Sequence, residues 1–206
     1  MLKIWGRRNS VNVQKVLWCC GELRLDYERI DAGLQFGVND TADYRAMNPN
    51  GLVPTIDHDG FVLWESHAIV RYLAGLYGRG TLWPEDPRAA ADADRWMEWY
   101  STTLWLNLRP IFHNLVRTPL EKRNMTEVED HRTKLAANFA IVEAQLERGE
   151  YLTGANFTMA DIPMGVAAHR WFNLPIERPA LSNVAHWYRR LCQRPAFKEH
   201  CMLPLT

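Results

Sequence analysis

The stretch NPNGLVPTIDHDGFVLWESHAI, residues 48–69, decides how the first part of the chain folds. Two short segments of it, 54–57 and 61–64, flank His58-Asp59-Gly60, and this arrangement predicts a β-hairpin. Ser66 follows directly and is typical of an N-cap, after which apolar residues recur at helical spacing. We therefore expect two antiparallel strands followed by a helix.

The residues before this stretch predict a strand, a helix and a second strand. Residues 2–5 and 26–31 are the strand candidates, and residues 10–23 carry apolar side chains three and four positions apart, as on one helix face. Residues 33–48 contain two Gly and several Asn and Asp residues, so we expect them to be irregular. The order β-α-β, loop, β-β-α predicts a small α/β domain over residues 1–77.

The rest of the chain predicts helices. Residues 78–87 carry two Gly and two Pro residues and predict a linker. Helices are expected over 88–109, where Pro110 should kink or interrupt the chain, over 127–148, and over 183–194, ended by Pro195. Thr158-Met159-Ala160-Asp161 is a capping box with Asp in the place of Glu. The predicted architecture is α/β followed by an all-α domain over residues 88–206.

The charge and cysteine content exclude several classes of protein. Lysine plus arginine and aspartate plus glutamate number 24 each in 206 residues, so no excess of positive charge indicates nucleic-acid binding. No apolar run approaches the ~18 residues needed to span a membrane, and the N-terminus does not resemble a signal peptide. The four cysteines form no CxxC pair, so we expect a cytoplasmic protein without a bound metal.

Ser10 and Asn12 lie at the start of the first predicted helix, where unpaired N–H groups and the helix dipole favour negative charge. Taken alone, Ser10 is well explained as an ordinary N-cap. In the functional interpretation, its hydroxyl and the Asn12 N–H donate to a thiolate and lower the sulfur pKa. A lowering of the sulfur pKa by one to two units corresponds to a preference of roughly 1–3 kcal/mol for the thiolate over the thiol. No cysteine lies near this position, so a ligand has to supply the thiol.

Two further segments each have a structural and a functional explanation. Val53-Pro54 is most simply a trans proline at an edge strand. A cis bond there would instead turn the Val53 backbone outward, where an extended peptide can pair with it. Ser66 is most simply an N-cap, but with the helix N–H groups it can also bind a carboxylate, while Glu65 binds the neighbouring ammonium group. Glu65 and Ser66 would then form a receptor for an amino-acid zwitterion.

In this order and spacing, the segments resemble cytosolic glutathione transferases over about residues 2–200. The chain is similar to the bacterial theta-like and nu-like groups, and the resemblance implies a thioredoxin-like glutathione-binding domain, an all-helical domain and a homodimer. The matching motifs are Ser10-x-Asn12-Val13-x-Lys15-Val16, Asn48-Pro49-x-Gly51-x-Val53-Pro54, Glu65-Ser66-x-Ala68-Ile69 and Leu152-x-Gly154-x-x-Phe157-Thr158-x-Ala160-Asp161.

The resemblance also implies how glutathione, the co-substrate, is held. Gln35 matches a polar contact to glutathione in nu-like members. Leu52 replaces a basic residue of many relatives, and His67 stands where relatives often have Arg or Asn. The other implied contacts are the γ-glutamyl end at Glu65 and Ser66, the cysteinyl backbone at Val53 beside a cis Pro54, and the sulfur at Ser10 and Asn12.

The electrophile is expected between the domains, against the long helix that begins near residue 88, because domain junctions are common sites for ligands. An aromatic stripe at helical spacing also fits a simple core. The candidate residues for the electrophile pocket are Trp99, Tyr100, Leu104, Asn107 and His113.

Three functions are compatible with these residues. In the first, the protein stabilises the thiolate of glutathione, which attacks a hydrophobic electrophile without a metal or a nucleotide. In the second, a nu-like disulfide-bond reductase or peroxidase uses glutathione on a disulfide or a peroxide. In the third, the chain is a non-catalytic interaction module, since a fold does not fix a function. Such modules often lose the thiol-site residues, and this chain retains Ser10, Asn12, Glu65 and Ser66.

Overall fold

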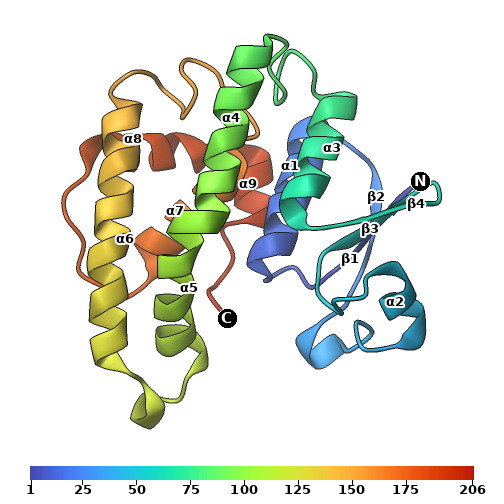
Figure 1. The fold of residues 1–206 in the computed structure, drawn as a ribbon, viewed down its shortest axis with the longest axis horizontal. Helices are drawn as coiled ribbons and strands as arrows, with labels where there is room; N and C mark the ends of the chain where they lie inside the picture. The colour runs from blue at the N-terminus through green and yellow to red at the C-terminus, as the bar shows by residue number, and fades with distance from the viewer.

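The computed structural model describes residues 1–206, with a four-stranded sheet on one side and a group of long helices on the other (Figure 1). The strand order is β2-β1-β3-β4. β1 (Leu2–Trp5) is parallel to β2 (Tyr27–Ile30) and antiparallel to β3 (Thr55–His58). β4 (Phe61–Trp64) pairs with β3 through an Asp59-Gly60 turn in which both residues have positive φ, as hairpin turns favour. The predicted strands and hairpin are confirmed.

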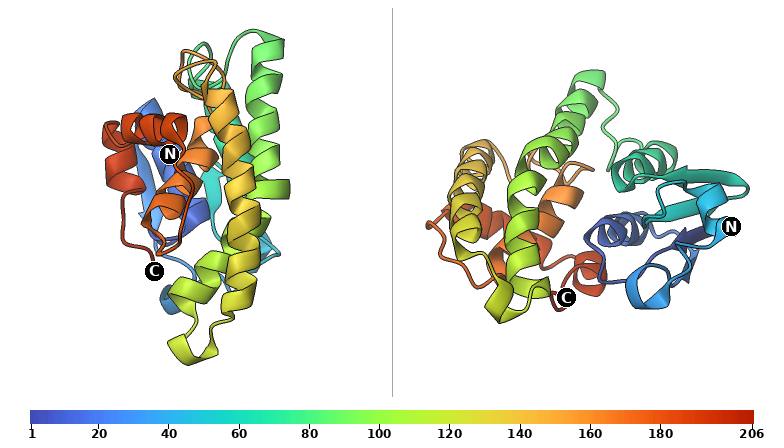
Figure 2. Two further views of the ribbon diagram at one scale, coloured as in Figure 1. Left: turned by 90° about the vertical axis from the view of Figure 1, so that its left-hand side faces the viewer. Right: turned by 60° about the horizontal axis from the view of Figure 1, so that its bottom comes forward.

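Two helices cover the face of the sheet that looks toward the helical half. α1 (Val11–Leu23) connects the parallel strands β1 and β2, and α3 (Ser66–Tyr77) follows β4. The two helices lie side by side between the sheet and the remaining helices (Figures 1 and 2). The N-termini of both helices therefore belong to the α/β domain, beside the junction with the helical domain.

Residues 33–48 are more regular than predicted. They contain a short 3₁₀ turn, Leu34–Phe36, and the helix α2 (Ala42–Met47). Thr41 caps α2, because its hydroxyl oxygen accepts a hydrogen bond from the N–H of Tyr44 at 3.3 Å. A helix of six residues is too short to show an apolar period, so the sequence pattern did not reveal it.

The helical domain packs around α7, which is buried along most of its length. α7 contacts α1 of the first domain as well as helices of its own domain, so the two domains share one core (Figure 2). The six α-helices of this domain are α4 (Pro87–Trp99), α5 (Trp105–Phe112), α6 (Met125–Leu146), α7 (Asp161–Asn173), α8 (Ser182–Leu191) and α9 (Pro195–His200).

Trp18 of α1 packs against the helical domain. Its buried ring lies 4.7 Å from the ring of Phe197 and 5.4 Å from that of Phe157, measured between centroids. α7 approaches this ring at Gly165, where an added Cβ would lie 2.7 Å from the indole. This packing fixes the position of the helical domain relative to the N-terminus of α1.

The long helix predicted over 88–109 differs from the prediction. It begins at Pro87, where Asp86 accepts a hydrogen bond from the N–H of Ala89 at 2.9 Å. Pro110 does not end it and lies inside α5. The interruptions are two wider π-helical turns, Tyr100–Leu104 and His113–Arg117, on either side of α5. The chain therefore stays helical up to the second turn, and it changes register at these turns rather than at the proline.

Three helix ends also correct the sequence analysis. Glu65 is the N-cap of α3, and Ser66 is its first residue. α8 ends before residue 194, and Pro195 begins α9 instead of ending a helix. Proline is common at the first helical position because its missing N–H would have no partner there.

The predicted capping box at residues 158–161 is present in part. The carboxylate of Asp161 accepts a hydrogen bond from the N–H of Thr158 at 3.0 Å. It also accepts bonds from the N–H of Leu152 at 3.2 Å and from the indole N–H of Trp187 at 2.9 Å. Asp161 is fully buried, so this one side chain ties α8 and two loop segments to the start of α7. None of the helices is long and apolar enough to span a lipid bilayer.

Candidate functional site

A cleft of about 380 Å³ lies between the N-terminus of α1 and the long helix of the helical domain. Its walls include Ser10, Asn12 and Val53 from the first domain and Trp105 from the second. A neighbouring cavity of about 470 Å³ lies at the N-terminus of α3 and is also lined by Asn12 and Trp105. Because Asn12 and Trp105 line both cavities, the two cavities lie next to each other between the domains.

Ser10 occupies the N-cap position of α1, but its side chain does not cap the helix. Its hydroxyl makes no hydrogen bond to the first N–H groups of α1, and the residue is 5% exposed and lines the cleft. The ordinary N-cap explanation therefore does not account for Ser10. Both the hydroxyl and the N–H groups at the positive end of the helix remain available to an anion.

Asn12 is held by a buried lysine. The Lys15 ammonium donates to the Oδ1 atom of Asn12 at 3.0 Å and contacts Nε2 of His67 at 3.0 Å. Lys15 is 2% exposed, and this burial lowers its pKa well below the ordinary value. The charge of Arg170 lowers the pKa of Lys15 further, and the charge of Glu65 raises it. Since Oδ1 is occupied, the amide N–H₂ group of Asn12 is left to donate into the cleft.

His67 stays neutral in this network. Burial, then the charges of Lys15 and Arg71, lower the pKa of His67 to about 2. Its Nε2 atom accepts from Lys15, so the ring proton is on Nδ1, which lies 3.2 Å from the hydroxyl oxygen of Ser101. A second cation at this position is thereby avoided. A neutral ring at this position thus suits the buried lysine.

The segment before Val53 is held in place by hydrogen bonds to its backbone. The carbonyl of Leu52 accepts from the hydroxyl of Tyr44 at 2.6 Å and from the side chain of Asn48 at 2.9 Å. The Val53–Pro54 peptide bond is cis. Neither the N–H nor the C=O of Val53 takes part in a hydrogen bond within the protein, so both groups are open to an extended ligand.

Glu65 and Ser66 form the end of the site at α3. Glu65 has φ +73°, a left-handed conformation that side chains other than glycine rarely adopt and that costs of order 1–3 kcal/mol. It places an exposed carboxylate directly before the helix, while Ser66 is 5% exposed and has no hydrogen-bond partner for its hydroxyl. A carboxylate and a helix N-terminus thus lie next to each other, as an amino-acid zwitterion requires.

The structure brings some of the predicted residues to this site and separates others from it. Ser10, Asn12, Val53, Glu65 and Ser66 each line at least one of the two adjacent cavities. Gln35 is exposed and lines a neighbouring pocket, which shares Arg7 and Asn9 with the cleft. Of the electrophile candidates, His113 lines the cleft and Tyr100 the cavity at α3.

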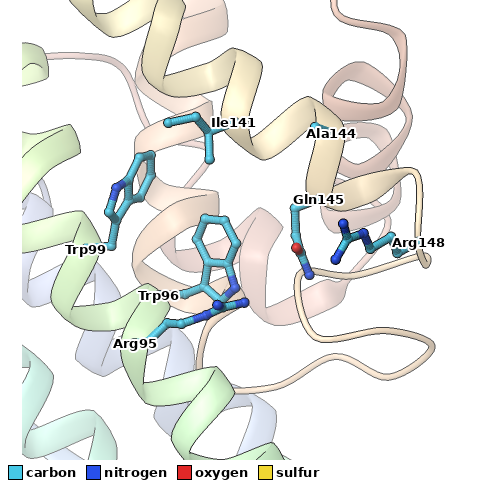
Figure 3. Close-up of a pocket in the computed structure, with 7 residues that line it drawn as sticks. All are labelled: Arg95, Trp96, Trp99, Ile141, Ala144, Gln145 and Arg148. Carbon is cyan, nitrogen blue, oxygen red and sulfur yellow. The ribbon is translucent and has the colours of Figure 1, made fainter.

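Three of the electrophile candidates lie elsewhere. Leu104 is fully buried in the core, and the side-chain amide of Asn107 donates to Asn138 at 2.9 Å. Trp99 lines a separate groove of about 310 Å³ between α4 and α6, together with Trp96 and Ile141 (Figure 3). These three side chains therefore do not face a ligand bound at Ser10.

The aromatic wall of the cleft is formed instead by Trp105 and Phe112, which the sequence analysis did not select. Arg7, Arg109, Arg117 and Arg170 complete it. The sequence does contain a pattern that corresponds to part of this wall. Its residues lie four positions apart, at 101, 105, 109, 113 and 117. In a regular helix of 3.6 residues per turn, such a row drifts by about 40° at each step. The two π-helical turns offset this drift.

None of the four cysteines lines the cleft. Cys19, Cys20 and Cys201 are buried, and burial raises the pKa of the Cys20 thiol to about 12. A protein thiolate therefore does not act at this site. No group of three or more His, Cys, Asp or Glu side chains is arranged to hold a metal ion.

Comparisons with known proteins agree with this geometry. The family "Glutathione S-transferase, N-terminal domain" matches residues 9–76, and "Glutathione S-transferase, C-terminal domain" matches residues 125–190. Over its whole length the chain is 41% identical to "Glutathione S-transferase GstB" of Escherichia coli, whose whole length is also covered. The chain belongs to the glutathione S-transferase family. The family resemblance and the enzyme class predicted from the motifs are thereby confirmed.

Other members of the glutathione S-transferase family support the same assignment. "Glutathione S-transferase 3" of Zea mays is 33% identical, with 96% of this chain and 92% of that protein covered. The theta-class transferase of Xanthomonas axonopodis pv. citri, solved with glutathione bound, superposes with a TM-score of 0.96 at 45% identity, covering 100% of this chain and 99% of that one. The predicted glutathione transferase fold and theta-like grouping are confirmed.

Proposed function

We propose that the cleft binds glutathione in one orientation and stabilises its thiolate for attack on an electrophile. The observation that carries the proposal is that three unsatisfied groups lie along one site: the Ser10 hydroxyl, the Val53 backbone and the Ser66 hydroxyl. Their order matches the thiol, peptide and amino-acid parts of the tripeptide. The γ-glutamyl ammonium would pair with Glu65 and its carboxylate with Ser66 and the N-terminus of α3.

The sulfur then lies at the N-terminus of α1. The hydroxyl of Ser10 and the amide of Asn12 donate to it, and each hydrogen bond stabilises the thiolate more than the thiol. Lys15 orients Asn12 through its Oδ1 atom. The thiol proton leaves to solvent, and the thiolate electron pair forms the bond to the electrophile. The apolar part of the electrophile packs on Trp105 and Phe112.

The test is a titration of the purified protein with reduced glutathione, followed by calorimetry and by ultraviolet thiolate absorbance. We expect saturable binding and a thiolate band at neutral pH. Glu65→Gln removes the partner of the ammonium and should weaken binding about tenfold, a loss of about 1.4 kcal/mol. Asp43→Ala, at an exposed position outside the site, is the control. Absence of binding at millimolar glutathione would refute the proposal and favour a non-catalytic module.

We also propose that two copies of the chain associate. The surface at β4 and α3 exposes Phe61, Leu76 and Tyr77, and the groove with Trp96, Trp99 and Ile141 lies on the helical domain (Figure 3). In a homodimer, α3 of one copy would pack on the second-domain helices of the other. Light scattering should then give about twice the 23.9 kDa chain mass. A single-chain mass at micromolar concentration would contradict this association.

A further inference from the structure

The lining of the cleft at Ser10 carries an excess of positive charge. Four arginines and one histidine line the cleft, and no aspartate or glutamate does: Arg7, Arg109, Arg117, Arg170 and His113. The chain as a whole is neutral, with 24 basic and 24 acidic residues. The cleft therefore concentrates one sign of charge that the rest of the surface does not share.

These cations have no partners of opposite charge within the protein. Arg7 is 9% exposed and Arg170 is 3% exposed, and the Nε atom of each is buried without a hydrogen-bond partner. The other nitrogens of Arg170 donate only to neutral oxygens, to Val166 at 3.3 Å and to Gln14 at 3.1 Å. Arg117 forms no ion pair, and its guanidinium lies 5.2 Å from the centroid of the Phe112 ring.

The cations also act on one another. Burial lowers the pKa of Arg170 to about 10, and the charge of Arg117 contributes to the same direction. Burial and Arg117 likewise lower the pKa of Arg7, and burial, Arg117 and Arg109 lower that of His113. The four arginines are thus the charged side chains that line this cleft, and each of them is a cation. An unpaired cluster of this kind destabilises the empty protein, and an anion relieves it.

Glutathione alone does not supply enough negative charge for this cluster. Its γ-glutamyl carboxylate belongs at Ser66, at the other end of the site, where Glu65 also binds its ammonium. Only two negative charges of glutathione, the thiolate and the glycine carboxylate, remain to neutralise the four guanidinium groups of the cleft. When the thiolate has formed its bond to the electrophile, one of these two charges is lost. The cluster therefore exceeds what the first substrate requires.

We infer that the second substrate of this cleft is an organic anion: a soft electrophile that carries a carboxylate beside an apolar body. The inference rests on the proposed function and specifies its second substrate. The apolar body would pack on Trp105 and Phe112, while Arg117 and Arg109, the two exposed arginines, bind the carboxylate. Arg7 and Arg170, which are buried, add positive charge to the same cleft.

The carboxylate takes no part in the bonds that change. With a chloroarene, the sulfur electron pair forms the S–C bond, and chloride leaves with the electron pair of the C–Cl bond. The proton of the glutathione thiol has already passed to solvent. The arginines position the ring carbon next to the sulfur and keep the anionic substrate close to an anionic nucleophile, which would otherwise repel it.

Two substrates of similar shape test this inference: 4-chloro-3-nitrobenzoate and its neutral carboxamide, each rate divided by the uncatalysed rate with glutathione. We expect the normalised kcat/KM of the benzoate to exceed that of the carboxamide at least tenfold. Arg117→Gln should lower the kcat/KM of the benzoate about tenfold, mainly through KM, and should lower the ratio of the benzoate value to the carboxamide value by a similar factor. Arg189→Gln, the same change of charge at an exposed residue of α8, should alter neither substrate. Added salt should weaken the benzoate preference.

A binding experiment makes the result independent of turnover. With the glutathione end filled by S-methylglutathione, 3-nitrobenzoate should bind at least tenfold more tightly than 3-nitrobenzamide, and Arg117→Gln should abolish the difference. Equal binding and equal normalised rates would overturn the inference, even if the thiolate band and turnover of the carboxamide show that the proposed function holds. Loss of the thiolate band itself would instead refute the proposed function.

Discussion

Ser10→Ala should lower turnover about 10- to 100-fold and change the affinity for glutathione much less. The hydroxyl has no structural partner in the protein, so its removal leaves α1 intact. Its bond to the sulfur is strongest when the sulfur is charged, and one to two pKa units of thiolate stabilisation correspond to this range of rates at neutral pH. Stopped-flow or steady-state assays with an aryl halide, together with calorimetry, measure both quantities.

The pH profile separates this effect from a general loss of structure. A hydrogen bond to the thiolate lowers the thiol pKa, so its loss raises that pKa and moves the rise of kcat/KM to higher pH by one to two units. At a pH above both values, Ser10→Ala and the wild type should converge. If Asn12→Ala shifts the profile and Ser10→Ala does not, the amide of Asn12 is the main donor and the two roles are reversed.

Asp161→Ala should lower the free energy of unfolding by about 3–5 kcal/mol. Three donors converge on this buried carboxylate: the N–H groups of Leu152 and Thr158 and the indole of Trp187. Each buried donor left without a partner costs about 1–3 kcal/mol, and the losses are partly shared. Urea denaturation followed by tryptophan fluorescence and circular dichroism would measure the change.

Two variants control this stability prediction. Asp161→Asn keeps one acceptor oxygen and should lose about half as much stability as Asp161→Ala. Asp43→Ala also removes an aspartate from the first turn of a helix, but an exposed one, and should stay within about 0.5 kcal/mol of the wild type. A loss below 1 kcal/mol for Asp161→Ala would show that water replaces the carboxylate at this position.

The α/β domain was the more predictable half of the chain because its signals are local. The Asp59-Gly60 hairpin, the strand before it and the helix after Ser66 each follow from a few adjacent residues. The proposed glutathione contacts share this property, since Ser10, Glu65 and Ser66 lie at helix ends. Their positions depend on where a helix starts, which capping patterns indicate to within a residue or two.

The aromatic wall of the cleft was less predictable because the positions of its residues depend on helix register over about five turns. Counting from Tyr100 at 3.6 residues per turn selects Leu104 and Asn107, but the π-helical turn at Tyr100–Leu104 shifts the register and brings Trp105 to the cleft. Nothing in the residue types marks such a turn. Lys15 and Arg170 were missed for another reason, since a long basic side chain on a helix is ordinarily at the surface.

The neutral chain and its basic cleft together act as a filter on the size of an anion. A polyanion such as a nucleic acid meets the outer surface, where the 24 acidic residues outnumber the 20 lysines and arginines outside the cleft and give no attraction at long range. A small anion within about 10 Å of the cleft is attracted by the four arginines more strongly than it is repelled by the acidic residues elsewhere, because salt screens the more distant charges. Capture is therefore fast only for solutes small enough to enter, and the enzyme can remain unbound among the polyanions of a cell.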